Sequence, residues 1–444
     1  MKLVTMSKSL KYFFFLTISS LIAAGIFPGS GGEGAQRDLV KLSQKQDWWN
    51  FATAFLYGMW PDSKFPWTYT LTLFQLSLYL LGIWLISKSF KPGTNRKVFL
   101  LVSLLGGMFV VQLWRDATVL ALQTLSIALL LRVRGMRSRK DFIYLFIGVL
   151  LNLMGSMFKP VFAPISALIF FFLFTRTRQK LKSQLLIVAI AILLAFLPFL
   201  TDKQLSQRFN LVKSYPEQQV LIYDLAKLYC WGFSPTVIEE SKKALTPLLN
   251  DPSNYEAICA SLSPTGWDAL RVQIPEVKSS PVLTPLGVLQ GDDVNALFNS
   301  WLRILIHHPL DWIMTKSADA SQVLLMANAF HAPNLYSDNS GGILTGTGNV
   351  LLKILYAPIL ALDKIRVFSL GFTLLLGLFL IYRNRARTDF SSGYEKVLFK
   401  FVGINLVIAV FGTLSFIANN GRYVLPYILL SYLYLMLSRE KEST

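Results

Sequence analysis

The sequence predicts an all-α membrane protein, a bundle of about ten transmembrane helices with a large, mostly helical outer (periplasmic) domain. Composition is the first observation: 53% of the 444 residues are hydrophobic, only 15% are charged, and mean hydropathy is +0.47. Soluble domains carry about 25% charged residues, so an ordinary cytosolic enzyme is excluded. The second observation is that basic residues cluster after alternate apolar runs, which is the positive-inside pattern of multi-pass proteins.

The net charge of +18 does not indicate nucleic-acid binding. The positive charge lies in short clusters between apolar runs, whereas residues 201–346 hold more acidic than basic side chains. No basic face with interleaved aromatic residues is present, as a nucleic-acid surface would require. The clusters instead place both termini in the cytoplasm and the protein in the plasma (inner) membrane.

Residues 1–200 form the predicted N-terminal membrane module. The first run follows Lys2, Lys8 and Lys11 and is interpreted as an uncleaved anchor, because no clean small-residue cleavage site follows it. Residues 28–67 form the first outer loop. The predicted spans are Tyr12–Phe27, Thr68–Ser87, Val98–Trp114, Ala117–Leu131, Phe142–Phe158, Val161–Thr175 and Gln184–Leu200.

Residues 201–349 form the predicted outer domain, with helical patterns over Val294–Leu305 and Pro309–Ala329. Cys230 and Cys259 lie in it. An oxidising compartment would favour a disulfide, and two free thiols are the alternative.

Residues 350–444 form the C-terminal module. Residues 350–362 are too short to cross about 30 Å of hydrocarbon and are interpreted as an interfacial or re-entrant segment. The predicted spans that follow are Ile365–Tyr382, Val397–Ala418 and Tyr423–Leu437.

The first outer loop contains the carboxylate that we favour as a catalytic base. Its tryptophans and phenylalanines predict short amphipathic helices on the membrane surface. Asp38 lies about ten residues beyond the first span, where a carboxylate could deprotonate an acceptor hydroxyl. Capping a helix, or pairing with Arg37 or Lys41, is the alternative role.

Few other charges occupy the predicted outer turns: Arg115, Asp116, Lys159 and Arg422. Three cations and one carboxylate at one end of a bundle would suit an anionic lipid head group. Snorkelling to the head groups, or an Arg115–Asp116 pair, is the alternative. In the outer domain Asp224 could contact substrate or lie on a solvated helix face. No spacing typical of a metal site occurs, so no cofactor is expected, although a divalent metal stays open.

Two short motifs and the layout resemble the GT-C superfamily of multi-spanning glycosyltransferases, which use polyprenyl-phosphate sugars. Arg422–Pro426, which reads RYVLP, is similar to a stretch late in some bacterial members. Trp114–Asp116 resembles their second short acidic loop. The chain departs from the pattern after the first span, where many members carry an adjacent acidic pair and this chain has Asp38 beside Arg37.

The resemblance implies a mechanism and its partners. Asp38 would activate the acceptor hydroxyl, with Asp116 as a second catalytic carboxylate. The hydroxyl would attack the anomeric carbon with inversion. Arg422, with Lys159 or Arg115, would hold the departing phosphate, and Tyr423 and Asp224 would contact substrate. The donor would be a polyprenyl-phosphate sugar with its tail between spans among the membrane lipids, and the acceptor a cell-envelope glycan or lipid.

Three alternatives stay open. An O-antigen polymerase or ligase has a similar layout and would depend more on His307 or His308. A transporter or flippase should carry ionisable groups near the membrane midplane, and the spans hold almost none. A non-catalytic assembly factor is the third alternative.

Overall fold

The structure is a computed structural model, and it describes ten stretches of the chain. These are residues 67–90, 115–133, 138–175, 181–208, 218–249, 255–262, 291–325, 369–386, 392–414 and 424–442, with a few single residues between 99 and 110. Within these residues the protein is all-helical and contains no strand, as the sequence predicted.

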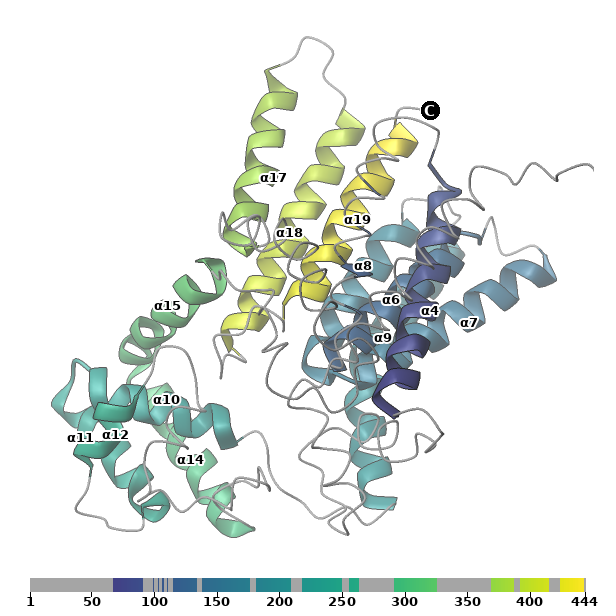
Figure 1. Cartoon of the computed structure of the whole chain (residues 1–444). Coiled ribbons are helices and arrows are strands. Elements are labelled where there is room, and N and C mark those ends of the chain that lie inside the picture. The colour runs from purple at the N-terminus through teal and green to yellow at the C-terminus, as the bar shows by residue number, and fades with distance from the viewer. Residues whose placement is uncertain are drawn as a thin grey trace, which may run out of the picture.

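The helices form three neighbouring sets (Figure 1). The first set is α4 (Trp67–Ser87), α6 (Arg115–Leu130), α7 (Arg139–Met157), the 3₁₀ turn η1 (Pro160–Phe162), α8 (Ala163–Thr175) and α9 (Leu181–Arg208). The second, here called the 218–325 group, is α10 (Gln218–Trp231), α11 (Pro235–Leu245), η2 (Thr246–Leu248), α12 (Glu256–Ser261), α14 (Asp292–His307) and α15 (Pro309–Leu325). The third is α17 (Leu370–Arg385), α18 (Ser392–Leu414) and α19 (Leu425–Glu442).

Three helical stretches are long and apolar enough to cross a membrane: Arg139–Met157, Leu185–Leu205 and Tyr394–Leu414. Shorter apolar helices cover Leu71–Ser87, Asp116–Leu130, Pro160–Phe172 and Leu425–Leu437. Most predicted spans therefore coincide with helices. The predicted span Tyr12–Phe27, most of Val98–Trp114 and the segment 350–362 lie outside the described residues.

Some helix boundaries differ from the prediction, and local chemistry accounts for them. Ser369 has extended backbone angles and accepts a hydrogen bond from the Phe372 amide, so α17 begins at Leu370 rather than at Ile365. A serine in this position satisfies an amide that the first helical turn leaves unpaired. Ser138 and Asp141 form a reciprocal capping box that starts α7. Helix α9 extends beyond Leu200, where the predicted span ended, and continues to Arg208.

Polar side chains join the apolar helices to one another. Asn152 of α7 donates to Gln123 of α6 at 2.8 Å, and Gln123 donates to the Asn152 carbonyl at 3.0 Å. In the third set the side-chain oxygen of Asn405 accepts from Thr373 and Ser431. Such buried amides and hydroxyls find partners on neighbouring helices because an apolar medium offers none.

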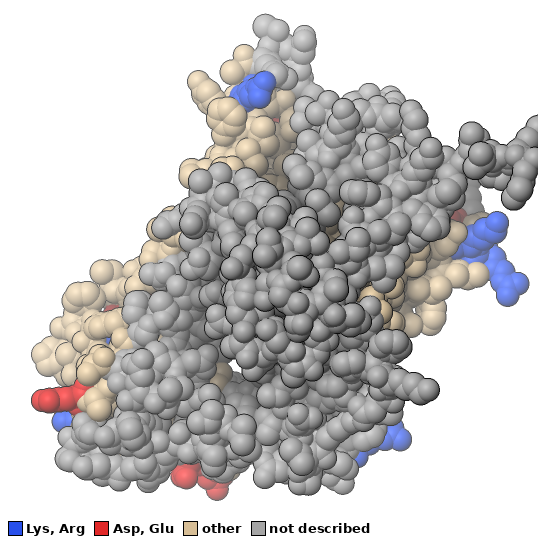
Figure 2. All heavy atoms as spheres, in the orientation of Figure 1, with Lys and Arg blue, Asp and Glu red and all other residues tan. Residues whose placement is uncertain are grey.

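Large apolar side chains point outward from α7 and α9. Phe146 is 69% exposed and Phe196 is 63% exposed, with further exposed residues along both helices. Figure 2 shows one face of the molecule, on which the visible described charges lie at its edges. Exposed apolar side chains along a helix are what contact with a bilayer requires.

The 218–325 group is the part of the chain predicted as an outer domain. α14 and α15 match the two predicted helical patterns. A disulfide joins Cys230 at the end of α10 to Cys259 of α12, so the disulfide alternative is confirmed and the chain has no free cysteine. α15 packs on α10 and α14 and also on α17 and α18, and so links this group to the third set.

Candidate functional site

Asp116 and Lys159 form an ion pair where the start of α6 meets the end of α7. Asp116 lies in the first turn of α6. Lys159 follows α7 directly and precedes Pro160, whose ring fixes the turn into η1. The Lys159 ammonium lies 2.5 Å from Asp116 Oδ1. The structure therefore brings together two of the four charged turn residues that the sequence singled out.

This pair is withdrawn from solvent. Asp116 is 0% exposed and Lys159 is 8% exposed. Among the described residues, Asp116 Oδ2 has no hydrogen-bond partner. Burying two charges costs more desolvation energy than an apolar pair would, so a buried ion pair is a poor means of stabilisation alone. A role beyond packing is the more economical explanation for its presence.

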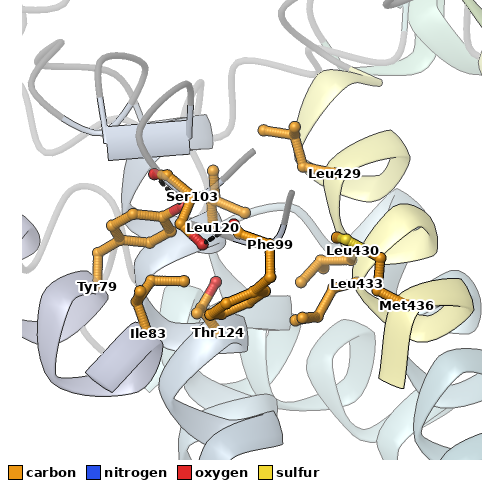
Figure 3. A pocket seen from close by; sticks show the side chains of 10 residues that line it. All are labelled: Tyr79, Ile83, Phe99, Ser103, Leu120, Thr124, Leu429, Leu430, Leu433 and Met436. Carbon is orange, nitrogen blue, oxygen red and sulfur yellow. Dashed lines mark hydrogen bonds between the residues drawn. The ribbon is translucent and has the colours of Figure 1, made fainter. Parts of the chain in front are cut away.

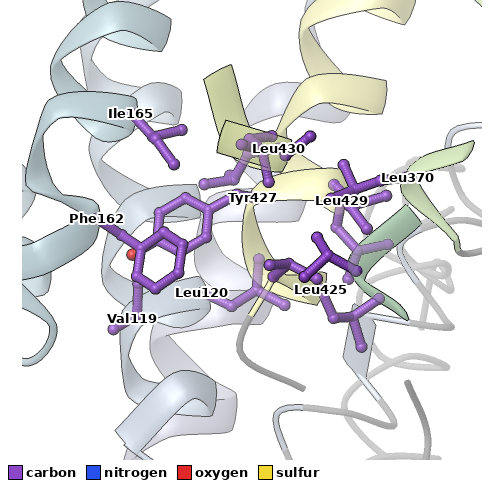
Figure 4. Packing of buried hydrophobic residues seen from close by; sticks show 14 of the residues in the cluster. Val119, Leu120, Phe162, Ile165, Leu370, Leu425, Tyr427, Leu429 and Leu430 are labelled. Carbon is purple, nitrogen blue, oxygen red and sulfur yellow. The ribbon is translucent and has the colours of Figure 1, made fainter. Parts of the chain in front are cut away.

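Aromatic rings adjoin the pair. The Lys159 ammonium lies 5.0 Å from the centroid of the Phe162 ring, within the distance of a cation–π contact. Phe162 stacks on Tyr427 of α19, with centroids 4.9 Å apart (Figure 4). Gln75 of α4 donates to Thr118 of α6, two residues after Asp116. The four helices α4, α6, α7 and α19, together with η1, thus converge around the ion pair.

An apolar pocket begins one helical turn beyond Asp116, at Leu120 (Figure 3). It lies between α4, α6 and α19 and has a cavity volume of about 20 Å³, which is room for about one water molecule. Its few polar groups include Tyr79, whose hydroxyl donates to the Ser103 carbonyl at 2.8 Å. The other lining residues are Ile83, Phe99, Thr124, Leu429, Leu430, Leu433 and Met436. The lining is mostly apolar, but the free space is far smaller than the roughly 300 Å³ at which ligand pockets begin.

A second charged cluster lies in the 218–325 group. Asp224 Oδ1 lies 2.8 Å from the Lys316 ammonium. Asp224 Oδ2 accepts from the indole nitrogens of Trp301 and Trp312, each at 3.2 Å. Asp224 is only 2% exposed, so it does not lie on a solvated helix face. Its carboxylate is engaged by neighbouring side chains rather than directed outward.

Asp319 completes this second cluster. It forms ion pairs with Lys227 of α10 and, at 3.3 Å, with Lys316. Burial, with a smaller effect of the Lys316 ammonium, lowers the pKa of Lys227 from 10.5 to about 7, although the Asp224 charge acts in the opposite direction. A buried group prefers its neutral form because water no longer solvates its charge.

The sequence did not single out Lys227, Lys316 or Asp319. The available signal was spacing: Asp224 and Lys227, like Lys316 and Asp319, are three residues apart on helices and so share a face. That spacing cannot show that the two helices bring the pairs together.

The remaining predicted site residues are only partly described. Arg115 is the first residue of α6, but its side chain lies outside the described residues, and so do Asp38, Arg422 and Tyr423. His308, at the corner between α14 and α15, lies 3.9 Å from Glu240. No group of three potential metal ligands occurs among the residues that the structure describes.

Comparison of the chain with protein-family models, with curated proteins and with solved structures found no match.

Proposed function

We propose that the protein is a membrane glycosyltransferase of the GT-C type, which moves a sugar from a polyprenyl phosphate to a cell-envelope glycan or lipid. The observation that supports this most directly is the buried Asp116–Lys159 pair one helical turn from the apolar pocket. A lipid phosphate needs a cation for its head group, and the Lys159 ammonium is one.

Lys159 has the chemistry to hold the departing phosphate. In the reaction the acceptor oxygen bonds to the anomeric carbon, while the bond from that carbon to the phosphate oxygen breaks and the phosphate keeps the electron pair. A cation at the phosphate stabilises the charge that develops. The phosphate would replace an Asp116 oxygen as the partner of Lys159.

Asp38 keeps the role of general base in this proposal. Asp116 is already held by the Lys159 ammonium. Its assigned task is to hold Lys159 in position before the donor binds. Asp38 would take the hydroxyl proton of the acceptor, and Arg422 would supply a second cation for the phosphate.

The proposal also includes a topology of ten spans. In it the Asp116–Lys159 pair lies on the outer face and both termini lie in the cytoplasm. Two contacts support such an alternating layout. The Arg132 guanidinium donates to the Leu85 carbonyl at 3.0 Å, which pairs the ends of α6 and α4. Arg385 pairs with Glu395 at the turn between α17 and α18. On α6, Arg132 lies at the opposite end from Asp116, as expected if basic clusters and the reaction site face opposite sides.

Transfer by isolated membranes tests the proposal. Membranes containing wild type, Asp38→Asn, Lys159→Met or the control Glu395→Gln would receive a panel of radiolabelled polyprenyl-phosphate sugars. We expect label to enter cell-envelope material with wild type and Glu395→Gln, and to fall at least a hundredfold with the other two. Glu395 is a matched control because it forms an ion pair away from Asp116.

The outcome separates the candidates. Transfer that survives in Asp38→Asn removes Asp38 as the base, and transfer that survives in Lys159→Met removes Lys159 as the phosphate ligand. Absence of transfer from every monosaccharide donor, with altered glycan chain length on deletion, would favour the polymerase or ligase instead.

A further inference from the structure

Lys316 lies where the 218–325 group meets the third set of helices. Its ammonium is 2.8 Å from Asp224 of α10 and 3.3 Å from Asp319 of its own helix. It is also 3.5 Å from the carbonyl of Thr413 in the last turn of α18. The final carbonyls of a helix lack intrahelical partners and carry partial negative charge. One buried cation therefore contacts α10, α15 and the end of α18.

The cluster pairs two lysines with two aspartates. Lys227 faces Asp319, and Lys316 faces both carboxylates. Lys316 also contacts α18. Lys227 and the two tryptophans instead join α10 to α14 and α15, within the 218–325 group.

A second contact holds the C-terminal end of α15. A Cβ atom placed on Gly412 of α18 would lie 3.1 Å from Val323, and one on Gly371 of α17 would lie 2.8 Å from the Leu324 carbonyl. The helices approach closely there because both positions are glycine. Val323 is seven residues beyond Lys316, or about two turns further along the same face.

These two contacts respond differently to separation. Opening the close-packed contact would expose apolar surface, which water disfavours. Opening the Lys316 contact would release charged and carbonyl groups that water solvates well, which recovers the desolvation energy lost on burial. On α15 the two contacts are about two turns apart, so the end of α15 with Val323 resists opening and the part with Lys316 opens more readily.

We propose that α15 is a hinged latch: the 218–325 group turns about the contact of Val323 and Leu324 with Gly412 and Gly371, and Lys316 is the catch that holds the closed arrangement. This inference concerns motion alone, and it stands whether or not the protein transfers sugars.

Distances between two spin labels test the latch in the full-length protein in lipid nanodiscs. One label is attached at Lys243→Cys, exposed on α11, and the other at Leu375→Cys, exposed on α17. The native cysteines form a disulfide and do not take the label. In the protein that carries only the two labelled cysteines, we expect one narrow distribution of the distance between the labels. Lys316→Met should at least double its width or add a longer-distance population, and Lys316→Arg should restore the narrow form.

Lys227→Met is the matched control, since it removes a lysine of the same cluster that pairs with Asp319 within the 218–325 group. Its distribution should stay narrow. If Lys316→Met does not fold, Asp224→Asn combined with Lys316→Met removes the charge pair together and should give the same broadening. An unchanged distribution in either protein overturns the latch. Equal broadening in Lys227→Met and Lys316→Met would overturn Lys316 as its catch.

Discussion

Asp116 is a carboxylate that the fold buries completely while giving it one cation, Lys159, among its described contacts. Water cannot replace that partner, so each charge depends on the other. Removing one charge of a buried pair is far more damaging than replacing both by apolar groups. Stability and activity should therefore respond differently to single and double replacement.

Asp116→Leu should lower the free energy of unfolding by about 3–5 kcal/mol, because it leaves the Lys159 ammonium buried without its carboxylate. Asp116→Leu combined with Lys159→Met should recover most of that loss, while sugar transfer stays absent in both. Thermal unfolding of the purified proteins measures the change in stability, and the assay of sugar transfer by isolated membranes measures the change in activity. A double variant that is less stable than the single one would contradict the assignment.

Lys227 makes a second prediction, on the dependence of stability on pH. Its pKa is about 7 in the folded protein and 10.5 as an ordinary lysine. Between these values the unfolded chain holds a proton that the folded protein has released. The free energy of unfolding should therefore rise with pH over this range, by at most about 1.4 kcal/mol per pH unit.

Melting temperatures between pH 7 and pH 9 check this dependence. Wild type should become more stable toward pH 9, and Lys227→Met should lose that increase. Lys243→Met, which removes an exposed lysine of α11, should retain it. The same slope in wild type and Lys227→Met would assign the effect to another group.

At the scale of elements, the close approach of two helices depends on glycine at the point of contact. A Cβ atom on Gly377 of α17 would lie 2.6 Å from the Val402 side chain and 3.2 Å from the Phe401 ring. Gly403, on the facing helix α18, has nothing within 4 Å of such an atom. Only the first glycine is required for the two helices to approach.

Gly377→Ala should destabilise the protein by about 1–3 kcal/mol, since overpacking forces the neighbouring side chains or helices to shift. Gly403→Ala should be neutral or stabilising by up to about 1 kcal/mol, because alanine favours helix more than glycine does. Thermal unfolding in one detergent measures both. Equal loss in the two variants would mean that glycine flexibility matters rather than space.

At the scale of the whole molecule, the prediction concerns which face each part occupies. The basic clusters predict a cytoplasmic C-terminus and an outer position for the 218–325 group. The disulfide within that group agrees with an oxidising compartment. A reporter fused after Thr444 should therefore read cytoplasmic. A cysteine at Lys243 should react with a membrane-impermeant maleimide in intact cells, and a protected cysteine there would reject the ten-span layout.

Periodicity and charge were sufficient for most of the helices because each signal is local. An apolar run bounded by basic residues predicts a helix wherever its neighbours lie, and Phe142–Phe158 coincides with α7 for this reason. The ends of the helices were predicted less well. A cap such as Ser369 depends on a hydrogen bond, and a hydropathy pattern carries no information about hydrogen bonds. The predicted base, Asp38, lies outside the described residues, so its role stays a prediction.

The sequence by itself determined the helical class and the apolar runs long enough to cross a membrane, because composition and spacing are properties of the chain. Only the tertiary structure decided which charges became partners. Asp116 pairs with Lys159, 43 residues away, and Lys227 with Asp319, 92 residues away. The physical reason is that an ion pair requires two side chains within about 4 Å, and that distance depends on how the helices pack.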